Sequence, residues 1–159
     1  MMKVELWEAP KKNVIMLEGF PGFGFVGTIA TEAIMDHLKP KLIGRVFSDK
    51  LPALIAVHDS KLVEPLGIFY DEKSNILITH AVANINGLEW ELSEAVLSVA
   101  SQVKAAEIIS LEGIGTFSPL ADVKASNKAF YYTNSDEAKK KFESLGVLPL
   151  KEGIIVGVT

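Results

Sequence analysis

The chain contains no cysteine, and this absence excludes several classes of site at once. Without thiols there can be no disulfide bond, thiolate nucleophile, zinc–thiolate site or iron–sulfur cluster. A chain of this kind suits a reducing compartment, and we expect a cytoplasmic protein.

The sequence also lacks clustered basic charge and long apolar runs. Its 16 basic residues are outnumbered by 20 acidic residues, which gives a formal net charge of -4, and no basic stripe with interleaved aromatics occurs. Nucleic acid is therefore not an expected partner. No segment approaches the roughly 18 uninterrupted apolar residues of a membrane span, and residues 1–12 resemble neither a signal peptide nor an anchor. We expect no membrane association.

What is present is the composition of a globular protein, with 48% hydrophobic and 23% charged residues over 159 positions. This length favours a single α/β domain over residues 1–159. The chain stops on the apolar run 153–159, so we expect a domain cut short of its natural C-terminus; a strand that simply comes last in the sheet is the alternative. No repeat or linker divides the sequence.

Apolar periodicity predicts alternating strands and helices. Buried runs that are too apolar to alternate, separated by helices, favour a mostly parallel sheet covered by helices on both faces. The turn 72–74 adds an antiparallel hairpin. In the first helix, Ile29, Ala33 and Ile34 fall on one face and Thr31 falls outside it. Strands are expected at 13–18, 42–48, 54–57, 66–71, 75–80, 107–112, 130–133 and from 153, and helices at 27–38, 89–104 and 135–145.

A glycine-rich turn joins the strand 13–18 to the first helix. Residues 22–27 match the pattern G-x-G-x-x-G, and Asp49 follows at the spacing of a ribose-binding acid. Backbone N–H groups of such a turn can bind a phosphate at a helix N-terminus. Alternatively, the glycines permit tight packing and positive φ, since the turn holds three phenylalanines and no Lys, Arg or Ser. The candidate anion-loop residues are Gly19, Gly22, Phe23, Gly24 and Gly27.

Leu-Glu-Gly occurs twice, at residues 17–19 and 111–113, each time at the carboxyl end of a predicted strand. Glu18 and Glu112 could therefore face one crevice, share a proton and act in acid/base chemistry, or hold a hard cation. Alternatively, each glutamate accepts hydrogen bonds that fix its turn. His80 ends another strand near Asn84 and Asn86 and could act as a base.

No hydrolase elbow, paired-histidine metal motif or Walker lysine accompanies these residues, and we expect no metal and no cofactor. His37 and His58 have the sequence context of surface or helix-end residues. Aromatic side chains in loops at the sheet edge favour a surface for another protein chain, or a cover over the core. The interface candidates are Phe20, Phe23, Phe25, Trp90 and Phe117.

Together, the segment 18–27, Leu51-Pro52, the helix start 88–91 and the second Leu-Glu-Gly at 111–113 resemble the archaeal branch of the proteasome assembly chaperone family, relatives of eukaryotic proteasome assembly chaperone 2. The resemblance implies a purine nucleoside phosphorylase-like fold, homo-oligomers and, in some members, docking on proteasome α-subunits. Some longer members carry a hydrophobic-Tyr-any tail, whereas this sequence ends in Gly157-Val158-Thr159.

Two functions from different classes remain open on the sequence. The first is a non-enzymatic, homo-oligomeric assembly module that binds proteasome α-subunits. The second is a small-molecule enzyme of the nucleoside phosphorylase or hydrolase type, in which the 19–27 turn binds an anion and Glu18, Glu112 or His80 acts as acid or base. A dinucleotide-binding oxidoreductase that uses Asp49 fits less well, because the turn is crowded with aromatics.

Overall fold

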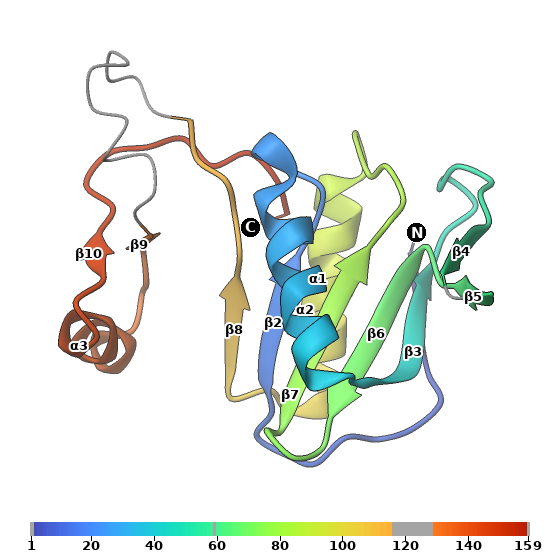
Figure 1. Ribbon diagram of the computed structural model, residues 1–159, viewed down its shortest axis with the longest axis horizontal. Coiled ribbons are helices and arrows are strands. Elements are labelled where there is room, and N and C mark those ends of the chain that lie inside the picture. Colours follow the sequence, from blue (N-terminus) through green and yellow to red (C-terminus); the bar gives the residue numbers. More distant parts are fainter. Residues whose placement is uncertain (1, 59, 116–128, 159) are drawn as a thin grey trace. The chain divides into compact units, whose positions relative to one another are not determined.

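The structure is a computed structural model that describes residues 2–58, 60–115 and 129–158. The chain forms two compact units (Figure 1). Unit 1 comprises Met1–Gly113 and Ile155–Thr159, and unit 2 comprises Ile114–Ile154. The chain thus leaves unit 1 after Gly113 and returns to it at Ile155.

Unit 1 is built on a six-stranded sheet with the order β1-β3-β6-β7-β2-β8. β2 lies between β7 and β8 and pairs in parallel with both. The pairs β1–β3, β3–β6 and β6–β7 are antiparallel. The strands are β1 (Lys3–Leu6), β2 (Ile15–Gly19), β3 (Lys41–Phe47), β6 (Leu66–Asp71), β7 (Ile76–Ala81) and β8 (Glu107–Ser110).

The α/β class is confirmed, but the expected mostly parallel sheet is wrong, because the sheet is mixed. Parallel neighbours require a long crossover connection, usually a helix. β6 and β7 are joined by the hairpin predicted at 72–74, whose turn spans 72–75, and the described residues between β3 and β6 contain no helix. The strands are continuously apolar because helices cover both faces of the sheet. This burial is the same for parallel and antiparallel strands, so it does not indicate strand direction.

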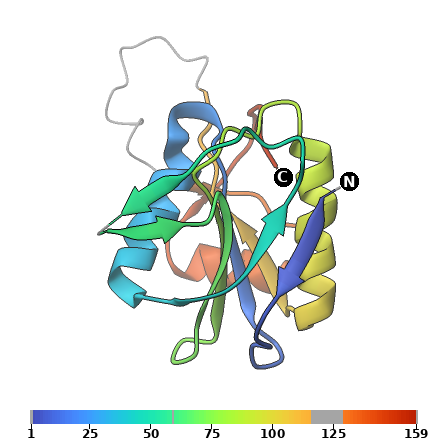
Figure 2. The same ribbon diagram turned by 90° about the vertical axis from the view of Figure 1, so that its right-hand side faces the viewer.

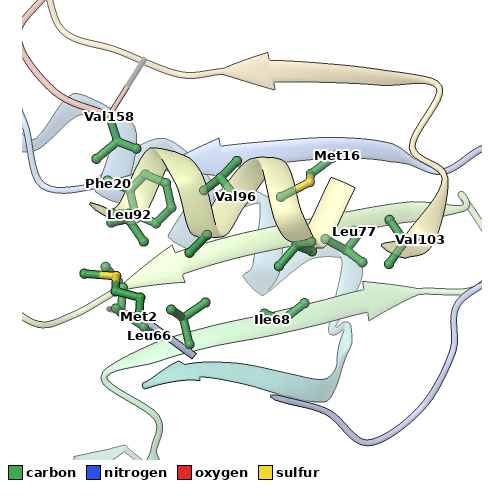
Figure 3. Packing of buried hydrophobic residues seen from close by; sticks show 14 of the residues in the cluster. Met2, Met16, Phe20, Leu66, Ile68, Leu77, Leu92, Val96, Val103 and Val158 are labelled. Carbon is green, nitrogen blue, oxygen red and sulfur yellow. The ribbon is translucent and has the colours of Figure 1, made fainter. Parts of the chain in front are cut away.

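Helices α1 (Val26–Leu38) and α2 (Glu89–Val103) lie on opposite faces of this sheet (Figure 2). The predicted amphipathic helix is confirmed in α2, which buries Leu92, Val96 and Val99 against the sheet. Figure 3 shows this core, in which side chains from α2 meet those of the strands. The core cluster also includes Val14, Met16, Phe20, Ile43, Val46, Leu66, Ile68, Leu77, Ala81, Ile85 and Val158.

Helix α1 meets the sheet through a different face from the one that periodicity suggests. Its buried residues are Gly27 and Thr31, whereas Ile29 is 60% exposed. The cause is a close approach to β2, since a Cβ at Gly19 would overlap the Gly27 carbonyl and the Thr31 methyl group. Small residues therefore face the sheet, and the apolar side chains of Val26 and Ile29 face solvent.

The remaining elements are short. In unit 1, β4 (Ala56–His58) pairs antiparallel with β5 (Lys61–Val63), and η1 (Phe23–Phe25) precedes α1. In unit 2, α3 (Asp136–Ser144) begins after Ser135, whose hydroxyl accepts the Ala138 N–H at 3.2 Å, and β9 (Phe130–Tyr131) pairs in parallel with β10 (Leu148–Pro149).

Several described segments differ from the sequence-based expectation, among them the short strands β5 and β10, which were not predicted. Residues 3–6 form the edge strand β1, which no pattern indicated. Residues 153–158, predicted as a strand, contain only a single bridge at Ile155, and the chain then inserts Val158 into the core of unit 1. Among the described residues, no helix is long and apolar enough to cross a membrane.

We expect Gly27→Ala to lower the free energy of unfolding by more than about 2 kcal/mol, because the added methyl group would overlap the Leu111 carbonyl oxygen. Gly24→Ala should cost only about 1 kcal/mol, since Gly24 has φ +66° but room for a Cβ. Urea denaturation followed by circular dichroism measures both. Equal effects of the two substitutions would contradict the packing role of Gly27.

Candidate functional site

The glycine-rich turn begins where β2 ends at Gly19 and passes through η1 into α1. Gly24 and Phe25 both adopt left-handed backbone conformations, with φ of 66° and 53°. Phe25 is the residue that caps α1, although it has no side chain able to accept a hydrogen bond from the first turn. This sharp reversal turns the rings of Phe23 and Phe25 outward.

At three glycines of this region, backbone atoms of a neighbouring segment occupy the space that a Cβ would take. A Cβ at Gly19 would overlap the Gly27 carbonyl, a Cβ at Gly27 would overlap the Leu111 carbonyl, and a Cβ at Gly113 would overlap the Phe23 carbonyl. The end of β2, the start of α1 and the segment after β8 therefore interlock through main-chain atoms. We call this contact the glycine junction.

The space beside Gly22 is lined by oxygen atoms. A Cβ placed there would lie 3.0 Å from Glu112 Oε2 and 3.2 Å from the Val156 carbonyl oxygen. A phosphate brought to this position would meet a carboxylate and a carbonyl instead of donors. The geometry therefore opposes the anion-loop interpretation of the turn.

Asp49 is also badly placed for a dinucleotide. It follows β3, and β6 and β7 lie between β3 and β2 in the sheet. Three strand spacings of about 4.8 Å separate β3 from β2 by about 14 Å. In a dinucleotide fold the ribose-binding acid follows the strand next to the glycine turn.

The structure brings Glu18 and Glu112 together, as the repeated Leu-Glu-Gly suggested. Ser110 lies opposite Glu18 on the neighbouring strand β8, its side chain is hydrogen-bonded to Glu18, and its hydroxyl donates to Glu112 Oε1 at 3.4 Å. Glu18 is 5% exposed, and its Oε2 has no hydrogen-bond partner among the described residues. Burial, aided by the nearby Glu112 charge, raises the pKa of Glu18 to about 7.

His80 does not join these carboxylates. Gly19 pairs with His80 across β2 and β7, and both face α1, whereas Glu18 is the adjacent residue and faces the other side of the sheet. His80 Nδ1 lies 2.9 Å from Thr31 Oγ1, and its Nε2 lies 3.7 Å from Glu32 Oε1. Burial lowers the pKa of His80 although Glu32 opposes this, so the ring is a neutral hydrogen-bonded core residue at pH 7.

The aromatic candidates for an interface divide into two groups. Phe20 is 2% exposed and belongs to the core, so its side chain cannot meet a partner. Phe23 and Phe25 are 59% and 61% exposed, and Trp90 at the start of α2 is 86% exposed. Phe117 lies outside the described residues.

Sequence reasoning named Phe23 and Phe25 as interface candidates but missed Val26 and Ile29, the outward apolar residues of α1. Phe23, Phe25, Val26 and Ile29 come from consecutive turns of η1 and α1, and each is at least 47% exposed. We call these four residues the α1 surface. The signal in the sequence was the small pair Gly27 and Thr31, spaced one helical turn apart, which marks the side that approaches a neighbouring backbone.

The fold and this site define an α/β protein whose glycine turn is a packing contact that presents apolar side chains. The PAC2 family model matches residues 16–159, and the chain belongs to the PAC2 family. The resemblance drawn from the turn and the repeated Leu-Glu-Gly is thereby confirmed.

Solved structures of similar fold include two proteins of the archaeon Pyrococcus furiosus. PbaA of Pyrococcus furiosus, described as an archaeal homologue of proteasome-assembly chaperone, is 32% identical with a TM-score of 0.82 over 98% of this chain and 63% of that one. PbaB of the same organism, described as an archaeal proteasome activator, has a TM-score of 0.76 over 99% of this chain and 71% of that one. At 17% identity, PbaB shows the fold alone.

An uncharacterised protein of Methanocaldococcus jannaschii is 26% identical over 91% of this chain. The chain spans 56% of the length of that relative and 63% of the length of PbaA.

We expect Glu18→Gln to flatten the pH dependence of stability. Because the pKa of Glu18 is raised in the folded state, the folded protein holds a proton that the unfolded chain has released. The contribution of Glu18 to the free energy of unfolding is therefore lost as pH rises from about 4.5 to about 7. Between pH 6 and pH 8 the free energy of unfolding of the wild type should fall by about 1 kcal/mol through this group. Urea denaturation of both proteins at the two pH values measures it, and an equal loss in Glu18→Gln would contradict the prediction.

Proposed function

We propose that the chain is a non-enzymatic protein-binding module of the proteasome assembly chaperone type, which acts in the cytoplasm, self-associates and contacts proteasome α-subunits. The observation that carries the proposal is the α1 surface, which is apolar and unpartnered within unit 1. The 32% identity to PbaA, described as a homologue of proteasome-assembly chaperone, supports the proteasome as the client.

The α1 surface has the chemistry of a protein interface. Two phenylalanines stand beside Val26 and Ile29, and aromatic side chains supply large contact area at low entropic cost. A well-packed monomer gains nothing by exposing them together, whereas a partner chain would remove them from water. The surface therefore fits another protein better than it fits a small metabolite.

The backbone of Phe25 supports this assignment. A bulky side chain at φ 53° is strained by about 1–2 kcal/mol relative to glycine at the same position. The ring gains no burial in unit 1 that would offset this strain, since it is 61% exposed. Strained residues are concentrated at functional sites, which favours Phe25 as a contact residue of the proposed interface.

The candidate acid/base groups are placed for structure rather than turnover. Packing around His80 and Thr79 leaves no space for a water-sized sphere, and Thr31, the hydroxyl nearest His80, is fully buried. Glu18 lies on the opposite face of the sheet from His80. Among the described residues, no group of three or more His, Asp or Glu side chains could hold a metal ion.

The test compares self-association and binding to purified proteasome α-subunits for wild type and Phe25→Asp/Ile29→Asp. Each substitution places a charge in the α1 surface, so we expect the dissociation constant of at least one of these two interactions to rise more than about thirtyfold. The urea midpoint should be unchanged, because both side chains are exposed. Analytical ultracentrifugation measures self-association and co-sedimentation measures α-subunit binding.

The matched control is Leu62→Asp/Leu97→Asp, which adds the same charge at exposed apolar residues of β5 and α2. It should bind as the wild type does. A wild-type chain that remains monomeric and ignores α-subunits would overturn the proposal. Self-association without α-subunit binding would contradict the assignment of the proteasome as the client, while the assignment as a protein-binding module would stand.

A further inference from the structure

A groove lies in unit 1 at the end of β2 that is remote from the glycine-rich turn. Its walls are the connection 7–12, which joins β1 to β2, and the C-terminal end of α2, the helix that lies alongside β1 (Figure 2). The groove has a volume of about 340 Å³, within the range of protein binding sites. We call it the Trp7 groove; its apolar lining consists of Leu6, Trp7, Ala9, Pro10 and Val103.

Hydrogen bonds hold both walls of the groove in place. The Asn13 N–H donates to the Lys104 carbonyl at 3.2 Å, and the Ala106 N–H donates to the Val14 carbonyl at 2.9 Å. The side-chain amide of Asn75 donates to the two carbonyl groups that precede Val14. The groove is therefore formed in the free protein, and a ligand would not have to order its main chain.

The charges around the groove are unbalanced. Glu8 is paired with Lys41, whose ammonium lies 2.5 Å from Glu8 Oε1. By contrast, the ammonium groups of Lys12 and Lys104, which also line the groove, form no ion pair or hydrogen bond with the described residues. Two uncompensated positive charges therefore stand beside an apolar surface, on a protein whose formal net charge is -4.

The strand beside the groove has an open edge. β1 is the terminal strand in the order of its sheet, and no described strand pairs with its outer side. The Trp7 N–H donates to the Ile43 carbonyl on β3 at 2.8 Å. Neighbouring residues of an antiparallel strand point their N–H and C=O groups in opposite directions, so those of Leu6 point away from β3. An extended peptide can pair with these groups and continue into the groove.

We propose that the Trp7 groove binds an extended peptide segment of another protein, in which apolar side chains are interspersed with carboxylates. The apolar side chains pack on Trp7, which is 50% exposed, and on Pro10, while the carboxylates meet Lys12 and Lys104. A peptide fits better than a small carboxylic acid for two reasons. Ammonium groups on flexible stems can follow carboxylates at varied positions, and the β1 edge offers main-chain hydrogen bonds.

This site goes beyond the proposed function, because it does not use the α1 surface. Helices α1 and α2 lie on opposite faces of the sheet (Figure 2). The α1 surface begins at the carboxyl end of β2, whereas the Trp7 groove lies at its amino end. The two sites can therefore be tested separately.

The test is an NMR titration of the full chain with a hexapeptide of alternating leucine and aspartate, blocked at both ends. The two tryptophans supply the reporter and its internal control, since Trp7 lines the groove and Trp90 is 86% exposed on α2. We expect the indole N–H signal of Trp7 to shift saturably, with a Kd below about 1 mM, while that of Trp90 stays unchanged. Hexapeptides of leucine with lysine, and of serine with aspartate, should bind at least about tenfold more weakly.

The variant Lys12→Glu/Lys104→Glu should raise the Kd of the leucine–aspartate peptide at least about tenfold, because both attractive charges are reversed. Its matched control is Lys61→Glu/Lys140→Glu, which makes the same change of net charge at exposed lysines outside the groove and should bind as the wild type does. Phe25→Asp/Ile29→Asp should also bind the peptide as the wild type does, so a failure of this site is distinguishable from a failure of the α1 surface.

Equal affinity for the three peptides, or equal affinity of the two double lysine variants, would overturn the proposal. The peptide comparison uses the wild type alone, so it does not depend on a variant that folds. A Trp7 signal that moves with protein concentration in the absence of peptide would show that a second copy fills the groove, and it would also overturn the proposal.

Discussion

The glycine junction is the contact on which the rest of unit 1 depends. Gly19, Gly27 and Gly113 bring three main-chain segments so close that any Cβ would overlap a carbonyl group of a neighbouring segment. Backbone packing between β2, α1 and the end of β8 accounts for these three glycines without a ligand.

Two features follow from this contact. Helix α1 must turn its small residues toward β2, so its apolar residues Val26 and Ile29 remain on the outside beside two phenylalanines. The segment after β8 packs against the turn through Gly113. This contact places Glu112 next to Glu18 and beside Gly157. A single steric constraint thus produces both the proposed binding surface and the meeting of Glu18 with Glu112.

Much of the fold could be predicted from the sequence, and the failures have physical causes. Helix α2 was recognised because its buried residues recur at helical spacing, and the β6–β7 hairpin because its turn is polar. The face of α1 was missed because close backbone contact outweighed hydrophobic periodicity. The antiparallel half of the sheet was missed because burial on both faces hides strand direction. The meeting of Glu18 with Glu112 was predictable, since both end parallel strands, whereas the placement of His80 on the opposite face required the register.

The most direct measurement is an NMR titration of the amides of residues 19–27 with inorganic phosphate and with ATP. Because backbone and acidic oxygens fill the turn, we expect no saturable shift of the Gly22, Gly24 or Gly27 amides up to millimolar ligand at constant ionic strength. Saturable shifts confined to these amides, with a dissociation constant below about 1 mM, would show a phosphate cradle and contradict the packing role of the glycine junction.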